Sequence, residues 1–324
     1  MKPIALNLLT LYADLAQSMP DGVPAGTISR RLEGGRRRLY ATIRDGVIKR
    51  QVYLGGVGDP AAEAKAEAHR RAAGDARNRR KIVSILKRSG IPAPDLETGR
   101  LLEVLANAGL FERAAVLIGT VAFQLYPLVV GAILPGGAGM TQDADLAVTR
   151  LAVPHLGAGV HLDEILRRAD PSYVAIMKRE DKLPKEFRSS RGFAVELLTT
   201  RGRVHAHLQI KELGCAAVPI RFMEYLIEDT IEVVALYGRG VKVRVPDPAR
   251  YAVHKLIIGQ QRRGKSTKAD KDFWQARELI GVLRLRNPDA LDDAISDAEE
   301  RGRTWKALVR NGLKLIETAE KSTP

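Results

Sequence analysis

The spacing of hydrophobic residues divides the first part of the chain into a helix, a β-hairpin and a second helix. Between residues 4 and 18, apolar side chains recur at steps of four, three and four, which predicts an amphipathic helix. Residues 29–55 instead alternate between apolar and polar side chains around an Asp-Gly pair at 45–46, and this pattern predicts a β-hairpin. An Asp-Pro pair at 59–60 then begins a long polar helix that runs to about Arg88.

The central part of the chain reads as short strands between helices. A Pro-rich stretch at 91–94 marks the first boundary, and helices are predicted at 96–108 and 121–130. Strands are predicted at 114–118, 143–148, 193–198, 231–236 and 241–245. After Pro246 the pattern is helical to the end. The sequence therefore predicts an α+β fold with a helix/hairpin/helix module at 1–94, a central domain at 95–245 and a helical C-terminal domain at 246–324.

Positive charge is concentrated near the N-terminus. Lysine and arginine total 52 against 38 aspartates and glutamates, a net charge of +14, and such an excess favours binding to polyanions. Eight of these cations lie between residues 30 and 50, with one tyrosine among them and another just after, a mixture that can hold phosphates and stack on bases. The candidate RNA contacts are Arg36, Arg37, Arg38, Tyr40 and Tyr53. The alternative is a solvated face.

Cysteine content and hydropathy exclude further classes of protein. A single cysteine, Cys215, rules out an internal disulfide and a cysteine-based zinc site, and its expected role is that of a half-buried structural thiol. No apolar run approaches the roughly 20 residues that a bilayer-spanning helix needs. The N-terminus lacks the cleavable pattern of a secretory signal. We therefore expect a cytoplasmic protein with no membrane partner.

Two aspartates on one predicted strand are the candidate catalytic groups. Asp143 and Asp145 are two residues apart, so on a strand their side chains point to one face, roughly 6.5–7 Å apart. Both carboxylates can then hold a pair of magnesium ions about 3.5–4 Å apart, although an Asp-x-Asp pair is also found in solvated turns. Gly119 and Thr120 stand where a predicted strand gives way to a helix. The glycine lets a phosphate approach the backbone, the free amides of the helix attract anions, and the threonine can cap the helix or bind a phosphate oxygen.

A glycine–hydroxyl pair followed by a strand with Asp-x-Asp resembles the signature of the polymerase-β-like nucleotidyltransferases. The stretches 117–123 and 141–147, with the long gap between them, resemble a bacterial family of nucleotidyltransferase-fold proteins. Further similar stretches are 195–198, 245–248, 254–256 and 271–276, so the resemblance spans most of residues 100–285. It implies a polymerase-β-like mixed sheet with flanking helices, in which the glycine turn holds the triphosphate and the paired aspartates bind the metals.

The resemblance also implies roles for residues further along the chain. Glu196 takes the place of the third metal-binding carboxylate, which prepares the acceptor hydroxyl; most of the superfamily has aspartate there, and glutamate reaches further. Lys255, Arg262 and Lys268 resemble the last motif of abortive-infection-type nucleotidyltransferase toxins, in which the lysine meets the triphosphate. An exposed strand residue and an exposed cationic helix are the alternatives.

Two other interpretations compete with this one. Residues 259–266 satisfy the P-loop pattern letter for letter, but a P-loop follows a strand, and the flanking sequence here reads as helix. A P-loop ATPase is therefore the least favoured reading. A catalytically inactive RNA-binding protein on a nucleotidyltransferase scaffold is the other, and the intact Asp143, Asp145 and Gly119 count against it. His205 and His207 lack an evident third ligand for a metal site.

Together these features predict a magnesium-dependent nucleotidyltransferase. It would move a nucleoside monophosphate from an NTP to a hydroxyl acceptor and release pyrophosphate. Two magnesium ions, or alternatively manganese, are the expected cofactors. The acceptor is an RNA or tRNA 3′ end, a protein side chain or a small molecule, and the basic N-terminal module favours RNA. By analogy with the toxins, an antitoxin protein is a candidate partner.

Overall fold

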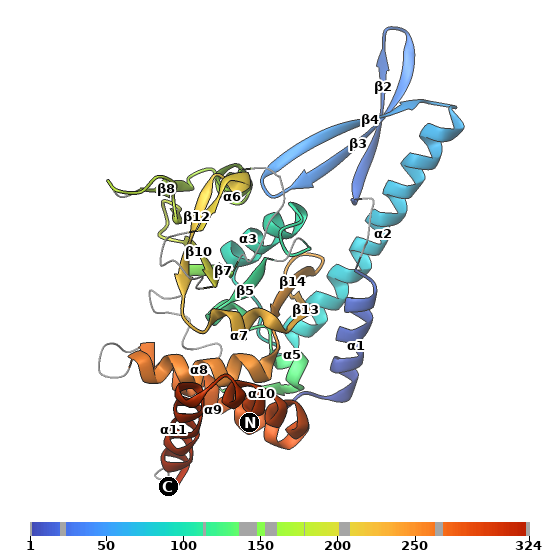
Figure 1. Ribbon diagram of the computed structural model, residues 1–324. Helices are drawn as coiled ribbons and strands as arrows, with labels where there is room; N and C mark the ends of the chain where they lie inside the picture. Colours follow the sequence, from blue (N-terminus) through green and yellow to red (C-terminus); the bar gives the residue numbers. More distant parts are fainter. Residues whose placement is uncertain are drawn as a thin grey trace.

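The computed structural model of the 324-residue chain describes residues 2–19, 24–112, 115–135, 148–152, 161–177, 179–200, 208–262 and 268–321. The architecture is α+β, as predicted. A central sheet is flanked by helices, an arm extends from one side, and a cluster of helices forms the C-terminal end (Figure 1). Among the described helices, none combines the length and the apolar character that a membrane span requires.

The arm consists of a small antiparallel sheet and one long helix. Its strands are β2 (Gly26–Glu33), β3 (Arg36–Asp45) and β4 (Ile48–Gly56), in that order, and its helix is α2 (Pro60–Arg88). The predicted hairpin is confirmed as β3–β4, and the predicted polar helix is confirmed as α2. β2 is an additional strand. Gly34 and Gly35 join it to β3, and both take the positive φ values (56° and 75°) that a tight hairpin turn requires.

One face of the small sheet is buried against α2. The contact is formed by Leu39, Ala41, Leu54, Ala62 and Ala66. The alanines of α2 lie four residues apart, on one side of the helix, and their small side chains let it approach the strands closely. In the part of the chain that the structure describes, no helix covers the opposite face of the sheet (Figure 1).

The N-terminal helix joins the arm to the rest of the protein. α1 (Leu6–Gln17) packs on the C-terminal part of α2 and on β13 (Thr230–Ala235), which forms an antiparallel pair with β14 (Val241–Pro246). Leu15, Val83 and Val234 share one apolar cluster. β1 (Lys2–Pro3) pairs with β6 (Ala132–Ile133) and anchors the start of the chain. The division at residues 94 and 245 stays a prediction.

The central sheet has the strand order β11-β12-β10-β7-β5. These strands are β5 (Val116–Ile118), β7 (Val148–Ala152), β10 (Ala194–Thr200), β11 (Leu208–Ile210) and β12 (Cys215–Ile220), and a 3-10 turn (Lys211–Leu213) links the last two. β10 is parallel to β7 and β12, whereas β5 is antiparallel to β7. β9 (Glu186–Arg188) is antiparallel to both β10 and β8 (Val174–Ile176). The sheet is therefore mixed, as the resemblance implies.

Several predicted elements differ from the observed ones in extent. The helix predicted at 121–130 is two short helices, α4 (Thr120–Phe123) and α5 (Pro127–Val130). Pro127 explains the break, because proline inside a helix removes a backbone hydrogen bond and its ring clashes with the preceding turn. The strand predicted at 143–148 meets β7 only at Val148, and residues 143–147 lie outside the described part of the chain.

Helices cover the sheet and build the C-terminal region. They are α3 (Leu96–Asn107), α6 (Leu162–Ala169), α7 (Met223–Glu228), α8 (Pro248–Arg262), α9 (Lys268–Arg286), α10 (Pro288–Glu300) and α11 (Arg303–Lys321). The predicted helical C-terminus is thus confirmed. Cys215 is fully rather than half buried, at the start of β12, and burial raises the pKa of its thiol to about 12.

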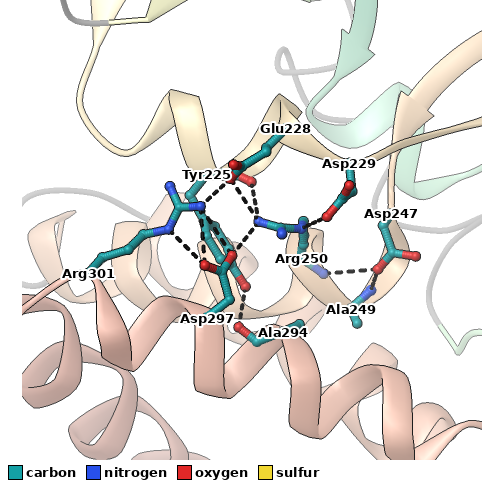
Figure 2. A network of polar contacts seen from close by, with 9 residues as sticks. All are labelled: Tyr225, Glu228, Asp229, Asp247, Ala249, Arg250, Ala294, Asp297 and Arg301. Atoms are coloured by element: carbon teal, nitrogen blue, oxygen red, sulfur yellow. Dashed lines mark hydrogen bonds and ion pairs between the residues drawn. The ribbon is translucent and has the colours of Figure 1, made fainter.

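Two arginines hold α7 against the C-terminal helices (Figure 2). Arg250 of α8 forms ion pairs of 2.5–3.3 Å with Glu228, Asp229 and Asp297. Arg301, just after α10, pairs with Glu228 and with Asp297. Both guanidinium groups lie over the ring of Tyr225, 4.9 and 5.0 Å from its centroid. Because these charges are shared among three helices, they fix the position of α7 relative to α8.

Candidate active site

A cavity of about 510 Å³ lies between the central sheet and helices α7 and α8. Its sheet side includes Ile118, Gly119, Glu196, Leu198, Val218 and Ile220. Its helix side is formed by Met223, Leu226, Tyr251, His254, Lys255, Ile258 and Arg262. Apolar walls with a few convergent polar groups, in a volume of roughly 300–1,000 Å³, are typical of small-molecule sites.

Strand register places the predicted third carboxylate close to the glycine turn. Ile118 on β5 and Glu196 on β10 both pair with Arg150 of β7, so the two residues lie in one row across three strands. Because β5 runs antiparallel to the other two strands, it ends at the edge of the sheet where β7 and β10 begin. Gly119 follows Ile118 at this edge. Gly119 and Glu196 therefore reach the same cavity from strands about 10 Å apart.

The predicted aspartates, Asp143 and Asp145, lie outside the described residues. In the sequence they precede Val148, the first residue of β7, which pairs with Ala194 at the start of β10. Within the described part of the chain, no group of three or more His, Cys, Asp or Glu side chains is placed to hold a metal ion. Glu196 alone therefore represents the predicted ligand set in the described structure.

The glycine turn has a backbone conformation that other residues rarely adopt. Gly119 has φ 76° and ψ −156°, in the region where a side chain would be strained. The following helix, α4, has only four residues. The turn therefore offers a close backbone approach rather than a helix dipole. Thr120 is half-buried as the first residue of α4 and is not among the described residues that line the cavity.

A buried hydrogen-bond network connects this turn to α8. The Tyr251 hydroxyl lies 3.0 Å from the Gly119 carbonyl oxygen and 3.0 Å from the side-chain amide of Gln275. One hydroxyl hydrogen cannot serve two acceptors. When the Gln275 amide is turned so that its NH₂ donates to Tyr251, the hydroxyl hydrogen is left for the Gly119 carbonyl, and each of the two contacts has one donor and one acceptor.

The two predicted cations of α8 share one buried carboxylate. Lys255 Nζ lies 2.5 Å from Asp272, and an Arg262 nitrogen lies 2.8 Å from the other oxygen of the same group. Asp272 is only 2% exposed, whereas both cations line the cavity. The three side chains therefore carry one net positive charge to the cavity wall. Asp272 therefore orients both cations.

His254 is a site residue that the sequence analysis did not single out. It lines the cavity, is 7% exposed, and neither ring nitrogen has a hydrogen-bond partner among the described residues. Burial, with a smaller contribution from the adjacent Lys255, lowers the pKa of His254 to about 3, so the imidazole is neutral. The sequence signal was slight, because a lone histidine on an apolar helix face is most often part of a core.

The cavity wall carries charged groups on both its sheet side and its helix side. On the sheet side, Lys185 forms an ion pair with Asp181, and both line the cavity. Glu186 of β9 lies directly opposite Glu196 in the antiparallel pair, and both line the cavity. Arg188 donates two hydrogen bonds (2.6 and 3.1 Å) to Glu186 and offsets part of this charge. Two further lining cations, Lys255 and Arg262, belong to α8. A ligand that fits this arrangement has an anionic group beside Lys255 and Arg262, and a group that binds a metal cation beside Glu186 and Glu196.

The remaining predicted site residues lie elsewhere. Lys268 is exposed at the start of α9 and is not among the described residues that line the cavity. The arm carries Arg36, Arg37, Arg38, Tyr40 and Tyr53. The structure thus brings together four of the predicted site residues, which are Gly119, Glu196, Lys255 and Arg262.

The described half of the P-loop pattern, residues 259–262, is helical. α8 covers its first four positions, 259–262, where a P-loop would leave a strand and turn around phosphates. A side chain at Gly259 would meet the ring of Phe273 at 3.1 Å. This glycine is therefore explained by the close packing of α8 on α9.

A mixed sheet that presents a glycine turn and a carboxylate to a cationic helix is the arrangement expected of a nucleotidyltransferase fold. Residues 96–300 match the model of a family described as Nucleotidyltransferase. The chain therefore belongs to this nucleotidyltransferase family, and the predicted superfamily is confirmed at that level. The bacterial origin and the relation to toxins stay predictions.

Comparison with individual proteins adds little to this assignment. A search of the curated proteins found no match. Among solved structures, the crystal structure of an antigenic nucleotidyltransferase-like protein from Paracoccidioides brasiliensis is similar, with 14% identity and a TM-score of 0.32. The similarity covers 66% of this chain and 92% of that chain. At this distance it carries no argument about the site.

Proposed function

We propose that the protein is a magnesium-dependent nucleotidyltransferase that moves a nucleoside monophosphate from an NTP to a hydroxyl acceptor. The observation that carries this proposal is the meeting of Gly119, Glu196, Lys255 and Arg262 in one cavity of a member of the nucleotidyltransferase family. In the proposed reaction, the acceptor oxygen forms a bond to the α-phosphorus. The bond from that phosphorus to the bridging oxygen breaks, and pyrophosphate leaves.

Each residue has a role that follows from its position. Gly119 lets a phosphate approach the backbone without a clash with a side chain. Lys255 and Arg262 supply the net positive charge that attracts the triphosphate, and Asp272 holds both cations in place. Glu196 is the group that accepts or orients the proton of the acceptor hydroxyl.

Magnesium would be held by Glu196 together with Asp143 and Asp145. The fit is chemical: a carboxylate in an open cavity is the hard oxygen ligand that magnesium prefers, and a few such ligands suffice when phosphates complete the shell. The bound ions would neutralise charge on the phosphate oxygens. Manganese is the alternative metal.

RNA is the proposed acceptor, because the arm presents a basic surface beside the nucleotidyltransferase fold. A protein side chain and a small molecule are the other acceptors that the chemistry allows. A tRNA 3′ end and an antitoxin partner belong to the same proposal by analogy with the toxins that the last motif resembles. A scaffold that only binds RNA is the competing function.

The decisive experiment incubates the protein with each α-³²P-labelled NTP, magnesium or manganese, and total cellular RNA. We expect one class of RNA to become labelled, with loss of the signal on chelation of the metal and in the Glu196→Gln variant. Label on protein or on a small molecule would change the acceptor but not the reaction. Absence of label from every fraction, with intact RNA binding, would establish the inactive scaffold instead.

A further inference from the structure

The face of the arm sheet that points away from α2 carries a stripe of cations and tyrosines. Because side chains alternate along a strand, the residues that share a face with Tyr40 are fixed by the register of β2, β3 and β4. The charged and aromatic members of this open face are Arg31, Glu33, Arg36, Arg38, Tyr40, Arg44, Lys49 and Tyr53. Arg37 pairs with Leu32, and alternation turns both to the α2 side.

The open face is strongly cationic. Five of its residues are arginine or lysine and only Glu33 is acidic. Arg31 and Arg38 stand directly opposite each other on β2 and β3, an arrangement of like charges that destabilises a sheet. Glu33 neutralises part of this charge through an ion pair of 3.3 Å with Arg38. An anionic ligand along the face would relieve the remaining repulsion.

The two tyrosine rings lie side by side, tilted at 50° to each other, and each has an arginine over it. The rings of Tyr40 and Tyr53 lie with centroids 5.4 Å apart, directly across from each other on β3 and β4. Arg31 lies over the Tyr40 ring at 5.4 Å, and Arg38 lies over the Tyr53 ring at 5.7 Å. Tyr40 is held by a 2.8 Å hydrogen bond from its hydroxyl to Glu33, whereas Tyr53 is 54% exposed. Tyr53 is therefore the ring that is available to a planar ligand.

We propose that this face binds single-stranded RNA, with phosphates along Arg31, Arg36 and Arg38 and an unstacked base on Tyr53. Charge and aromatic surface combined in this way are typical of single-strand binding, because every base has a face that can stack. In a duplex the bases are already stacked on each other, so Tyr53 would contribute nothing. β3 has ten residues and spans about 30 Å, which is enough for a short oligonucleotide. The inference rests on the proposed RNA acceptor and names its form and its contacts.

The test compares neighbouring arginines that the register turns to opposite faces. Arg38→Ala and Arg37→Ala remove the same charge from adjacent positions of β3, and Arg38 alone lies on the open face. Binding of a fluorescent single-stranded 12-mer RNA, and of the same sequence as a duplex, is measured by anisotropy over a salt series. We expect Arg38→Ala to lower the slope of log affinity against log salt by about 0.7, as one lost phosphate contact does on a single strand. Arg37→Ala should leave that slope unchanged.

A second pair of variants isolates stacking from charge. Tyr53→Phe keeps the ring and should bind the single strand like the wild type. Tyr53→Leu should weaken single-strand binding by roughly 5- to 150-fold, the range for one base–aromatic stack, without a change in salt dependence. Tyr53 is exposed, so both variants should fold, and circular dichroism checks this.

Three outcomes overturn the inference. Equal effects of Arg37→Ala and Arg38→Ala would exclude the open face as the site. Duplex binding that is as tight as single-strand binding and insensitive to Tyr53→Leu would assign the face to duplex phosphates. A wild-type protein that binds neither RNA would reject it outright. The NTP-labelling experiment distinguishes failure of the RNA site from failure of the proposed transfer reaction. Transfer to another acceptor without RNA binding would support the enzyme and reject the RNA site. The expected RNA binding without any transfer would support the RNA site and reject the enzyme.

Discussion

The hydroxyl of Tyr251 and the carbonyl oxygen of Gly119, 132 positions apart in the chain, lie 3.0 Å apart at the edge of the cavity. The Tyr251 ring also packs against Tyr126 and carries the Lys255 ammonium group 5.3 Å from its centroid. One side chain thus positions both the turn that is proposed to meet the phosphates and the cation that is proposed to attract them.

Tyr251→Phe should reduce the free energy of unfolding by roughly 1–3 kcal/mol, because the half-buried Gly119 carbonyl and the buried Gln275 amide lose this hydrogen-bond partner. The KM for the NTP should rise, because the turn is no longer held. Tyr126→Phe is the matched control: its hydroxyl donates to the Pro246 carbonyl at 2.9 Å, away from the cavity. Both variants should lose similar stability in thermal melts. A KM shift in the control, or none in Tyr251→Phe, would refute the role of this hydrogen bond.

Glu196→Gln should lower kcat by about 10²–10⁴-fold while the protein stays folded, because it removes a charge from a half-buried cavity side chain and keeps its size. The magnesium concentration for half-maximal activity should also rise if this carboxylate binds the metal. Glu232→Gln, on β13 and outside the cavity, is the control and should leave both values unchanged.

Asp143→Ala and Asp145→Ala are expected to abolish transfer, because each removes a proposed metal ligand. Activity above a few per cent in both would end the assignment.

Asp272→Asn should destabilise the fold by roughly 3–5 kcal/mol, because it leaves Lys255 and Arg262 without their shared buried carboxylate. Asp297→Asn offers a contrast. Its side chain is 35% exposed, and Arg250 keeps Glu228 and Asp229 as partners, so the loss should be about 1 kcal/mol or less. Urea denaturation of the two variants measures the difference. Equal losses would mean that the buried ion pairs of Asp272 contribute no more to stability than the more exposed ion pairs of Asp297.

Lys255→Met should lower kcat/KM for the NTP by roughly 10- to 150-fold, the effect of one charge-assisted contact, while the apolar part of the side chain is retained. Lys265→Ala should have little effect, because the P-loop pattern begins inside helix α8. Steady-state kinetics with a range of NTP concentrations separates the two. If Lys265→Ala alone eliminated NTP binding and Asp143 proved dispensable, the ATPase interpretation would have to be revived.

His254 should make the protein less stable in mild acid. Its pKa is lowered from 6.5 to about 3 by burial, then by Lys255 and Arg262, with Asp272 acting in the opposite direction. Between these values the unfolded chain binds a proton that the folded protein excludes. Stability should therefore fall by roughly 1.4 kcal/mol per pH unit as the pH drops below 6.5.

His254→Phe keeps a ring of similar size and removes the titrating group. Chemical denaturation at pH 7.5 and pH 5 should show a smaller difference for this variant than for the wild type. An identical pH dependence in the two proteins would show that the imidazole is not held neutral.

Local sequence was enough wherever short-range rules decide the structure. The hairpin of β3 and β4 and the long helix α2 were predicted because an Asp-Gly turn, a period of two and an Asp-Pro start act over a few residues. The strand β2 was missed as a separate element, although Gly34 and Gly35 provide its turn. Pro127 divides the predicted helix at 121–130, and this local signal outweighs the apolar spacing on which the prediction rests.

The sequence by itself determined the α+β class, the basic N-terminal segment and the identities of Gly119, Glu196, Lys255 and Arg262 as candidates. Only the tertiary structure decided that these four side chains share a cavity, that Asp272 binds both cations, and that His254 is held neutral beside them. The tertiary structure also decided that Arg37 and Arg38 lie on opposite faces of the arm sheet. The physical reason is the same in each case: residue spacing encodes which way a side chain points along its own helix or strand, whereas strand register and helix packing bring distant elements together, and no local pattern specifies them.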